Sequence, residues 1–195
     1  MPNLNALIGS RICHDLINPL GAISNGFELL SMSGAVQGPE MELVSDSVEN
    51  ATARVKFLRM AFGAASPDQM VSRSEILSTL QSIAHCGRLS YSWNVPSDSR
   101  RIEARVALLS MMCIETALPV GGDIEISHDG ARWTVYSQHE RLNLNPDLWA
   151  PLSKNICPEE LTAAQVHFGL LPEMSAEAQR TLTLSHGTDW VKITF

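Results

Sequence analysis

The first 62 residues carry two long runs of apolar side chains at helical spacing, and this pattern constrains the fold more than any other feature. In the first run, apolar residues recur at steps of three and four, as on one face of a helix. Its members are Ile8, Ile12, Leu16, Leu20, Ile23, Phe27 and Leu30. Gly34 and Gly38 then favour a turn, and Pro39 suits the first position of a second helix.

The second run keeps alternating steps of three and four over three repeats, which is typical of a heptad seam. Its members are Met41, Val44, Val48, Ala51, Val55, Leu58 and Phe62. The two runs together predict an antiparallel helical hairpin. One hairpin cannot cover both apolar seams, whereas two hairpins from two chains can form a four-helix bundle. We therefore expect a homodimer, although the rest of the chain could instead cover the hairpin in a monomer.

The pattern becomes mixed after a predicted linker at residues 64–73. Ser72 and Glu75 match a capping box that opens a helix through about Cys86. Further elements are a strand over 89–95, a helix over 100–118, strands over 123–127 and 133–137, a helix over 159–171, and strands over 182–185 and 190–195. We expect an α/β sandwich with one mixed sheet and helices on one face. The predicted domains are residues 1–65 and 72–195.

Composition excludes several classes of function. The 195 residues are 45% apolar and 18% charged, which fits a folded protein. The formal net charge is −7 and no basic run is interleaved with aromatic residues, so nucleic acid is not an expected partner. No secretory signal and no apolar run of about 18 residues is present, which predicts a cytoplasmic protein without a membrane partner. Four isolated cysteines and scattered histidines predict neither disulfides nor a metal site.

One polar cluster lies on the first helix. His14 is two residues from the nearest stripe positions on either side, about 200° around the helix, so it should point outward. Arg11 precedes it by one turn and Asn18 follows it by one turn, which should line these side chains along one exposed face with Asp15 beside them. An exposed histidine alone is usually only a solvated side chain.

The run from Cys13 to Ile23, CHDLINPLGAI, resembles the phosphoacceptor motif of histidine-kinase dimerisation domains, His-acid-x-x-Asn/Thr-Pro-Leu. More closely, the chain resembles the ChpT-type bacterial histidine phosphotransferases. The resemblance implies an α+β fold, in which a dimeric helical hairpin precedes a degenerate ATPase-like domain of the histidine-kinase type. It also implies that His14 is the phosphoacceptor.

The residue types suit this chemistry. Neutral imidazole is a competent nitrogen nucleophile at cellular pH. Asp15 could hydrogen-bond the other ring nitrogen and stabilise the charge that develops on the ring. Asn18 could hydrogen-bond phosphoryl oxygens, and Arg11 could offset their charge.

Residues 105–122 resemble the helix of a kinase ATPase domain that bears an asparagine-rich box. Ser110 and Ile114 stand where the asparagines are expected, so the Mg²⁺ ligand of that family is missing. Glu115 is a nearby carboxylate that could equally be a solvated or helix-capping charge. The Asp-x-Gly-x-Gly loop that should follow is replaced by residues 138–144, QHERLNL. We therefore expect no nucleotide cofactor and a domain that braces the bundle or docks partners.

The favoured hypothesis is a phosphorelay intermediate rather than an ATP-dependent kinase. His14 would accept phosphate from a receiver domain of a hybrid histidine kinase and pass it to the receiver of a response regulator, with Mg²⁺ in the receiver. A second hypothesis is a non-catalytic protein that sequesters receivers or kinases. A third, an autokinase with an unusual nucleotide site, is disfavoured by the missing motifs.

Overall fold

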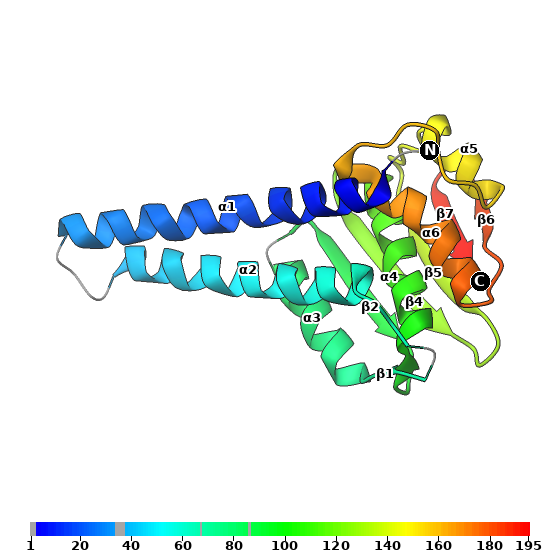
Figure 1. The fold of residues 1–195 in the computed structure, drawn as a ribbon, viewed down its shortest axis with the longest axis horizontal. Helices are drawn as coiled ribbons and strands as arrows, with labels where there is room; N and C mark the ends of the chain where they lie inside the picture. The colour runs from blue at the N-terminus through cyan, green and yellow to red at the C-terminus, as the bar shows by residue number, and fades with distance from the viewer. Residues whose placement is uncertain (1–2, 34–37, 67, 86) are drawn as a thin grey trace.

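The computed structural model describes residues 3–33, 38–66, 68–85 and 87–195, and it has an elongated shape. Two long helices, α1 (Leu4–Ser33) and α2 (Pro39–Phe62), lie side by side and project from a compact α/β body (Figure 1). The antiparallel hairpin predicted from the two apolar runs is confirmed. The centre of the predicted turn, residues 34–37, lies outside the described residues.

The apolar side chains of the hairpin are only partly covered within one chain. On α2, Val44 and Leu58 are buried at 6% and 5% exposure, while Val48 and Val55 are 46% and 49% exposed. On α1, Phe27 is 60% exposed. The described part of the body contacts the base of the hairpin and leaves this apolar surface open, so the alternative in which the rest of the chain covers the hairpin is met only in part.

The body contains a five-stranded mixed sheet in the order β2-β4-β5-β7-β6. Its strands are β2 (Leu89–Asn94), β4 (Gly122–His128), β5 (Trp133–Gln138), β6 (Thr183–His186) and β7 (Trp190–Thr194). β2 and β4 pair in parallel and the other neighbours pair antiparallel. A second, two-stranded sheet joins β1 (Met70–Val71) to β3 (Ser99–Arg100), so the predicted linker contains a short strand.

Side chains alternate between the two faces of the large sheet. Ile126 on β4 faces Val135 on β5, which in turn faces Ile193 on β7, and all three are buried. Their neighbours Glu125 and Lys192 lie on the other, more open face. This alternation is typical of a sheet that is covered on one side only. The prediction of a mixed sheet with helices on one face is confirmed for the five-stranded sheet, and the two-stranded sheet was not predicted.

The helices of the body are α3 (Arg73–His85), α4 (Arg101–Thr116), α5 (Pro146–Ser153), the 3-10 turn η1 (Ala163–Gln165) and α6 (Val166–Glu177). One of the two bonds of the predicted capping box is present at α3, where Ser72 Oγ accepts the backbone N–H of Glu75 at 3.2 Å. The predicted end of this helix, Cys86, lies outside the described residues.

Two helices of the body differ from the predictions. The expected helix over 159–171 is wrong at both ends, because Thr162 and Gln165 form a capping box that starts η1 at residue 163. α6 then continues through Pro172 to Glu177, since the packing of buried side chains outweighs the lost backbone donor. α5 was not predicted, although Asn145 caps it by accepting the Asp147 amide.

The hairpin and the body share one hydrophobic core. α4 packs against the sheet, α6 and α2, and its Met111 and Ile114 are completely buried. α2 contributes Phe57, Met60 and Ala61 to the same cluster. This continuous packing fixes the base of the hairpin against the body. Among the described residues, none of the helices combines the length and apolar character that crossing a membrane requires.

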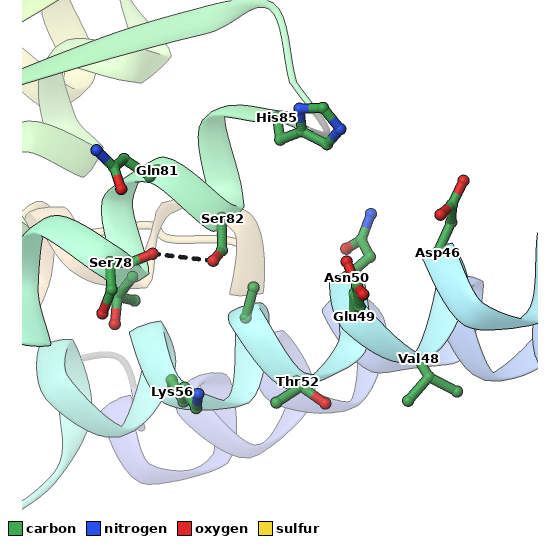
Figure 2. A pocket seen from close by; sticks show the side chains of 12 residues that line it. Asp46, Val48, Glu49, Asn50, Thr52, Lys56, Ser78, Gln81, Ser82 and His85 are labelled. Carbon is green, nitrogen blue, oxygen red and sulfur yellow. Dashed lines mark hydrogen bonds between the residues drawn. The ribbon is translucent and has the colours of Figure 1, made fainter.

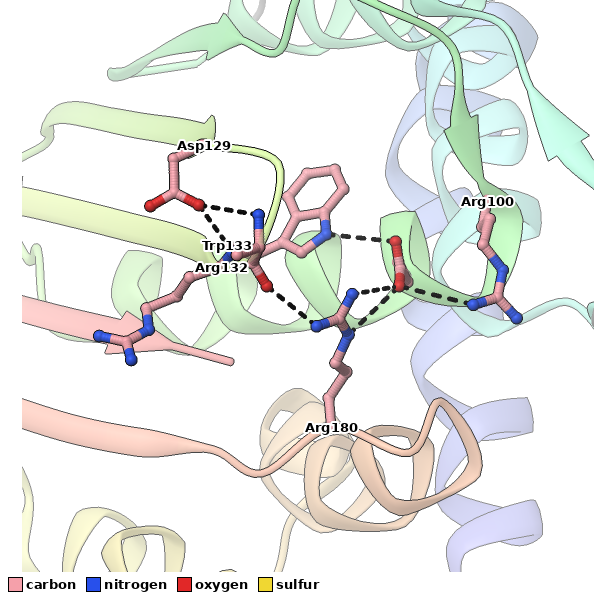
Figure 3. Close-up of polar contacts among 7 residues, drawn as sticks. Arg100, Asp129, Arg132, Trp133 and Arg180 are labelled. Carbon is pink, nitrogen blue, oxygen red and sulfur yellow. Dashed lines mark hydrogen bonds and ion pairs between the residues drawn. The ribbon is translucent and has the colours of Figure 1, made fainter.

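A buried carboxylate, Glu103 on α4, ties three parts of the body together, and Figure 3 labels its partners Arg100, Trp133 and Arg180. Arg180 donates to its Oε1 at 2.7 Å, and Trp133 Nε1 donates to its Oε2 at 3.4 Å. Arg100 lies 3.7 Å from the same carboxylate. Arg180 also donates to the carbonyl of Ala131 at 3.0 Å, so it links the segment before β6 to the β4–β5 hairpin.

Replacing Arg180 with alanine should lower the free energy of unfolding by about 2 kcal/mol, as measured by urea denaturation. The Glu103 side chain is 8% exposed and would lose its closest charged partner. The loss stays below that of a fully buried pair because Arg180 is itself 29% exposed and Arg100 remains nearby. Arg132→Ala, in the exposed hairpin, is the control, and equal stabilities of the two variants would contradict the prediction.

Candidate functional site

The segment CHDLINPLGAI lies within α1, whose first turns pass over η1 and α6 (Figure 1). His14 is therefore on a continuous helix, as predicted. Its side chain lies outside the described part of the chain, so its outward direction stays a prediction. Asn18 is exposed, as expected.

Arg11 and Asp15 do not share the open face that the sequence predicted for them. Arg11 Nε donates to Asp15 Oδ2 at 2.8 Å, and their side chains are only 20% and 10% exposed. Arg11 Nη1 also donates to the carbonyl of Ala164 in η1 at 2.8 Å. The expected exposure of Arg11 is wrong because η1 packs against this part of α1.

A cavity of about 190 Å³ lies where α1, α2, β2 and α4 meet. Arg11 and Asp15 line it from α1, Arg54 from α2, Tyr91 from β2 and Glu115 from α4. Tyr91 Oη donates to Glu115 Oε1 at 2.8 Å, so Glu115 is neither a freely solvated charge nor a helix cap. Sequence reasoning did not pair these two residues, because they are 24 positions apart and come from different elements.

Burial sets the charge state of this pair. Burial raises the pKa of Glu115 to about 7, although the Tyr91 hydrogen bond and the charge of Arg11 both favour its ionised form. Burial, together with the Glu115 charge, also raises the pKa of Tyr91. The tyrosine is thus a hydrogen-bond donor at neutral pH, and Glu115 changes charge in the physiological range.

Stability should fall as pH rises from 4.5 to about 7 through the contribution of Glu115. The unfolded chain releases this proton near pH 4.5 and the folded chain holds it to about 7, so the folded state binds more protons in this window. Melting temperatures of the wild type and Glu115→Gln at several pH values test this. The melting temperature of Glu115→Gln should rise relative to that of the wild type as pH increases. A difference in melting temperature that stays constant with pH would contradict the raised pKa of Glu115.

His167 on α6 acts in the opposite direction. Burial lowers its pKa from 6.5 to about 3, so the folded chain keeps a neutral imidazole that an unfolded chain would protonate. The stability of the fold therefore falls as pH drops from 6.5 toward 3. This effect is the same in the wild type and in Glu115→Gln, because both contain His167. His167 Nε2 lies 3.1 Å from Thr116 Oγ1, at a hollow of about 360 Å³ that Arg11 also lines.

A third hollow, of about 680 Å³, lies between α2 and α3 (Figure 2). Asp46, Glu49, Gln81 and His85 are among the polar side chains that line it. Val48 also lines it from α2 and is 46% exposed (Figure 2). In the part of the chain that the structure describes, no three His, Cys, Asp or Glu side chains lie close enough to hold a metal ion.

A helical hairpin that carries a His-Asp-x-x-Asn-Pro motif and packs on a mixed α/β body defines a protein of the histidine phosphotransfer class. The family model of the histidine phosphotransferase C-terminal domain matches residues 73–189. The chain therefore belongs to the histidine phosphotransferase family, and its function is histidine phosphotransfer in a phosphorelay.

Two known proteins are similar over most of the chain. Protein phosphotransferase ChpT of Brucella abortus (strain 2308) is 32% identical over 169 residues, which are 81% of this chain and 78% of that protein. The solved structure of a bacterial phosphotransferase superposes with a TM-score of 0.79 at 26% identity, covering 98% of this chain and 95% of the other. The ChpT-type resemblance found in the sequence is confirmed.

Proposed function

We propose that this chain is a phosphorelay intermediate in which His14 accepts a phosphoryl group from a receiver aspartate of a hybrid histidine kinase. It then passes the group to the receiver of a response regulator. The observation that carries this proposal is the family membership of a chain whose long first helix bears His14 within CHDLINPLGAI. Asn18, exposed one turn further on, would donate to phosphoryl oxygens.

In the forward step, an imidazole nitrogen of His14 attacks the phosphorus of the aspartyl phosphate. The new N–P bond forms as the acyl phosphate O–P bond breaks, and the receiver carboxylate leaves with the bonding electrons. The reverse chemistry delivers the group to the next receiver. Asp15 would stabilise the positive charge that develops on the ring, and Mg²⁺ in the receiver would offset the phosphoryl charge.

The test is label transfer from a phosphorylated receiver of the same organism. The chain should acquire an acid-labile, base-stable phosphoryl group, as expected of a phosphoramidate. A chain that bound receivers without acquiring label would instead be the sequestering protein of the alternative hypothesis.

We also propose that residues 72–195 form a degenerate ATPase-like domain that does not bind ATP, and that it follows a hairpin domain of residues 1–65 with which it shares a core. Ser110 and Ile114, at the positions of the expected asparagines, are both completely buried, which supports this proposal because neither could reach a nucleotide. The segment 138–144, which stands in place of the Asp-x-Gly-x-Gly loop, supports it too. In this segment the backbone N–H of Asn143 donates to the carbonyl of Ala117 at 3.0 Å. We further propose a cytoplasmic location, where receivers of this kind act.

Titration with ATP and Mg²⁺ should therefore leave the melting temperature unchanged. A nucleotide present at a hundredfold excess over its dissociation constant would stabilise the fold by about 2.7 kcal/mol. A saturable rise in melting temperature of that size would restore the autokinase hypothesis.

The exposed apolar side chains of the hairpin support a homodimer. Seven-residue spacing places Leu20 with Phe27 on α1, and Val48 with Val55 on α2, and all four are 46% to 60% exposed in one chain. Burial of a helical stripe of this kind against a second copy is the ordinary way to remove it from water. We propose that two hairpins form a four-helix bundle.

A further inference from the structure

Arg11 connects the acceptor helix to the body. Its guanidinium donates to Asp15 of the same helix and to the carbonyl of Ala164, which lies 153 positions further along the chain, both at 2.8 Å. One rigid, planar cation thus bridges a side chain beside His14 and the backbone of η1. The geometry is suited to holding a carboxylate in one orientation.

The surroundings leave Asp15 little freedom. Its side chain is 10% exposed, and it lines the cavity that also contains Arg54, Tyr91 and Glu115. Glu115 accepts a hydrogen bond from Tyr91 Oη at 2.8 Å. The positive charge of Arg11 is also close enough to lower the pKa of Glu115. A second carboxylate therefore shares the cavity, while Arg11 is hydrogen-bonded to Asp15.

Engagement with two groups inside the protein argues against contact between Arg11 and a transferred phosphoryl group. A guanidinium that reached out to a phosphoryl oxygen would have to give up the Asp15 carboxylate, the Ala164 carbonyl or both. The residue one turn after His14, Asn18, is by contrast exposed.

We propose that Arg11 is a positioning residue, through which the C-terminal body orients Asp15 next to the phosphoacceptor. This inference rests on the proposed role of His14. It gives the ATPase-like body a part in phosphotransfer that does not need a nucleotide: the body supplies the Ala164 carbonyl that anchors Arg11.

The rate of label transfer from a phosphorylated receiver, measured over a range of receiver concentrations, tests the proposal. Arg11→Ala should lower the saturating rate about tenfold and leave the half-saturating receiver concentration unchanged, because orientation is lost and docking is not. Arg11→Lys should recover part of the rate, since an ammonium keeps the charge but not the two-pronged geometry.

A double-mutant cycle separates this role from others. If Arg11 acts through Asp15, Arg11→Ala combined with Asp15→Asn should be no slower than Asp15→Asn alone. Multiplicative effects, or a higher half-saturating concentration with an unchanged saturating rate, would overturn the proposal and place Arg11 in contact with the receiver.

Arg180→Ala is the matched control for stability, because it removes a partly buried guanidinium contact with Glu103 that involves no residue of α1. It should lower the melting temperature and leave the transfer rate unchanged, which shows that lost stability alone does not slow transfer. His14→Ala distinguishes the proposed phosphoacceptor role from the positioning role of Arg11. Transfer that survives His14→Ala defeats the proposed function, whereas transfer that depends on His14 but not on Arg11 defeats only this inference.

Discussion

Replacing His14 with alanine should abolish phosphoryl transfer to this chain. No other side chain in the run from Cys13 to Ile23 can form the acid-labile, base-stable bond of a phosphoramidate. The loss should be complete within detection, because the variant lacks the atom that bonds to phosphorus. The measurement is label transfer from a receiver that carries an aspartyl phosphate, followed by exposure of the product to acid and base.

The neighbours of His14 should have smaller effects of graded size. Asn18→Ala and Asp15→Ala should slow transfer by about 10- to 1,000-fold without eliminating it, because they orient and stabilise rather than bond to phosphorus. All three variants should still bind the receiver, since a protein interface is much larger than one side chain. If His14→Ala were labelled as well as the wild type, the acceptor would lie elsewhere and the relay mechanism proposed for this helix would be wrong.

The elements that the sequence predicted well are those whose signal is local. The steps of three and four in residues 8–62 require only neighbours along the chain, and they located α1 and α2. The local patterns over 123–127 and 133–137 located β4 and β5 in the same way. α5 was missed because its 8 residues are too few for a periodic pattern to emerge.

The candidate site shows what such patterns cannot predict. Helical spacing correctly groups Arg11 with Asn18, but it cannot say whether another part of the chain covers that face. η1 covers it near Arg11 and leaves Asn18 open. Tyr91 on β2 and Glu115 on α4 meet at the cavity that α1 and α2 also line. Their pairing depends on this tertiary arrangement, so no pattern of neighbouring residues in the sequence predicts it.

The shared core gives the hairpin and the body a mechanical connection. Because Phe57 and Ala61 of α2 pack with residues of α4, the base of the hairpin cannot tilt without opening the core. Arg11 adds a polar link on α1, close to the acceptor segment. A receiver that docks on α1 therefore meets a surface whose position is set by the body, which suits a reaction that depends on in-line placement of two groups.

Introducing aspartate at both Val48 and Val55 should convert a dimer of twice 21.3 kDa into a monomer, as measured by light scattering. In a four-helix bundle these positions would be buried, and an unpaired buried carboxylate costs several kcal/mol. Within one chain they are 46% and 49% exposed, so the substitutions should leave the fold of the protomer intact. Circular dichroism should therefore retain its helical signal while the mass halves.

The control is Gln81→Asp, which introduces one aspartate on α3, outside the apolar seam of the hairpin. It should stay dimeric, because Gln81 lies on α3 and is not part of the apolar seam of the hairpin. A wild-type mass of 21.3 kDa, or a doubly substituted chain that keeps the dimeric mass, would show that no second copy covers Val48 and Val55. The exposed apolar side chains would then be open to another partner, and a receiver that lost affinity for the doubly substituted chain would identify that partner directly.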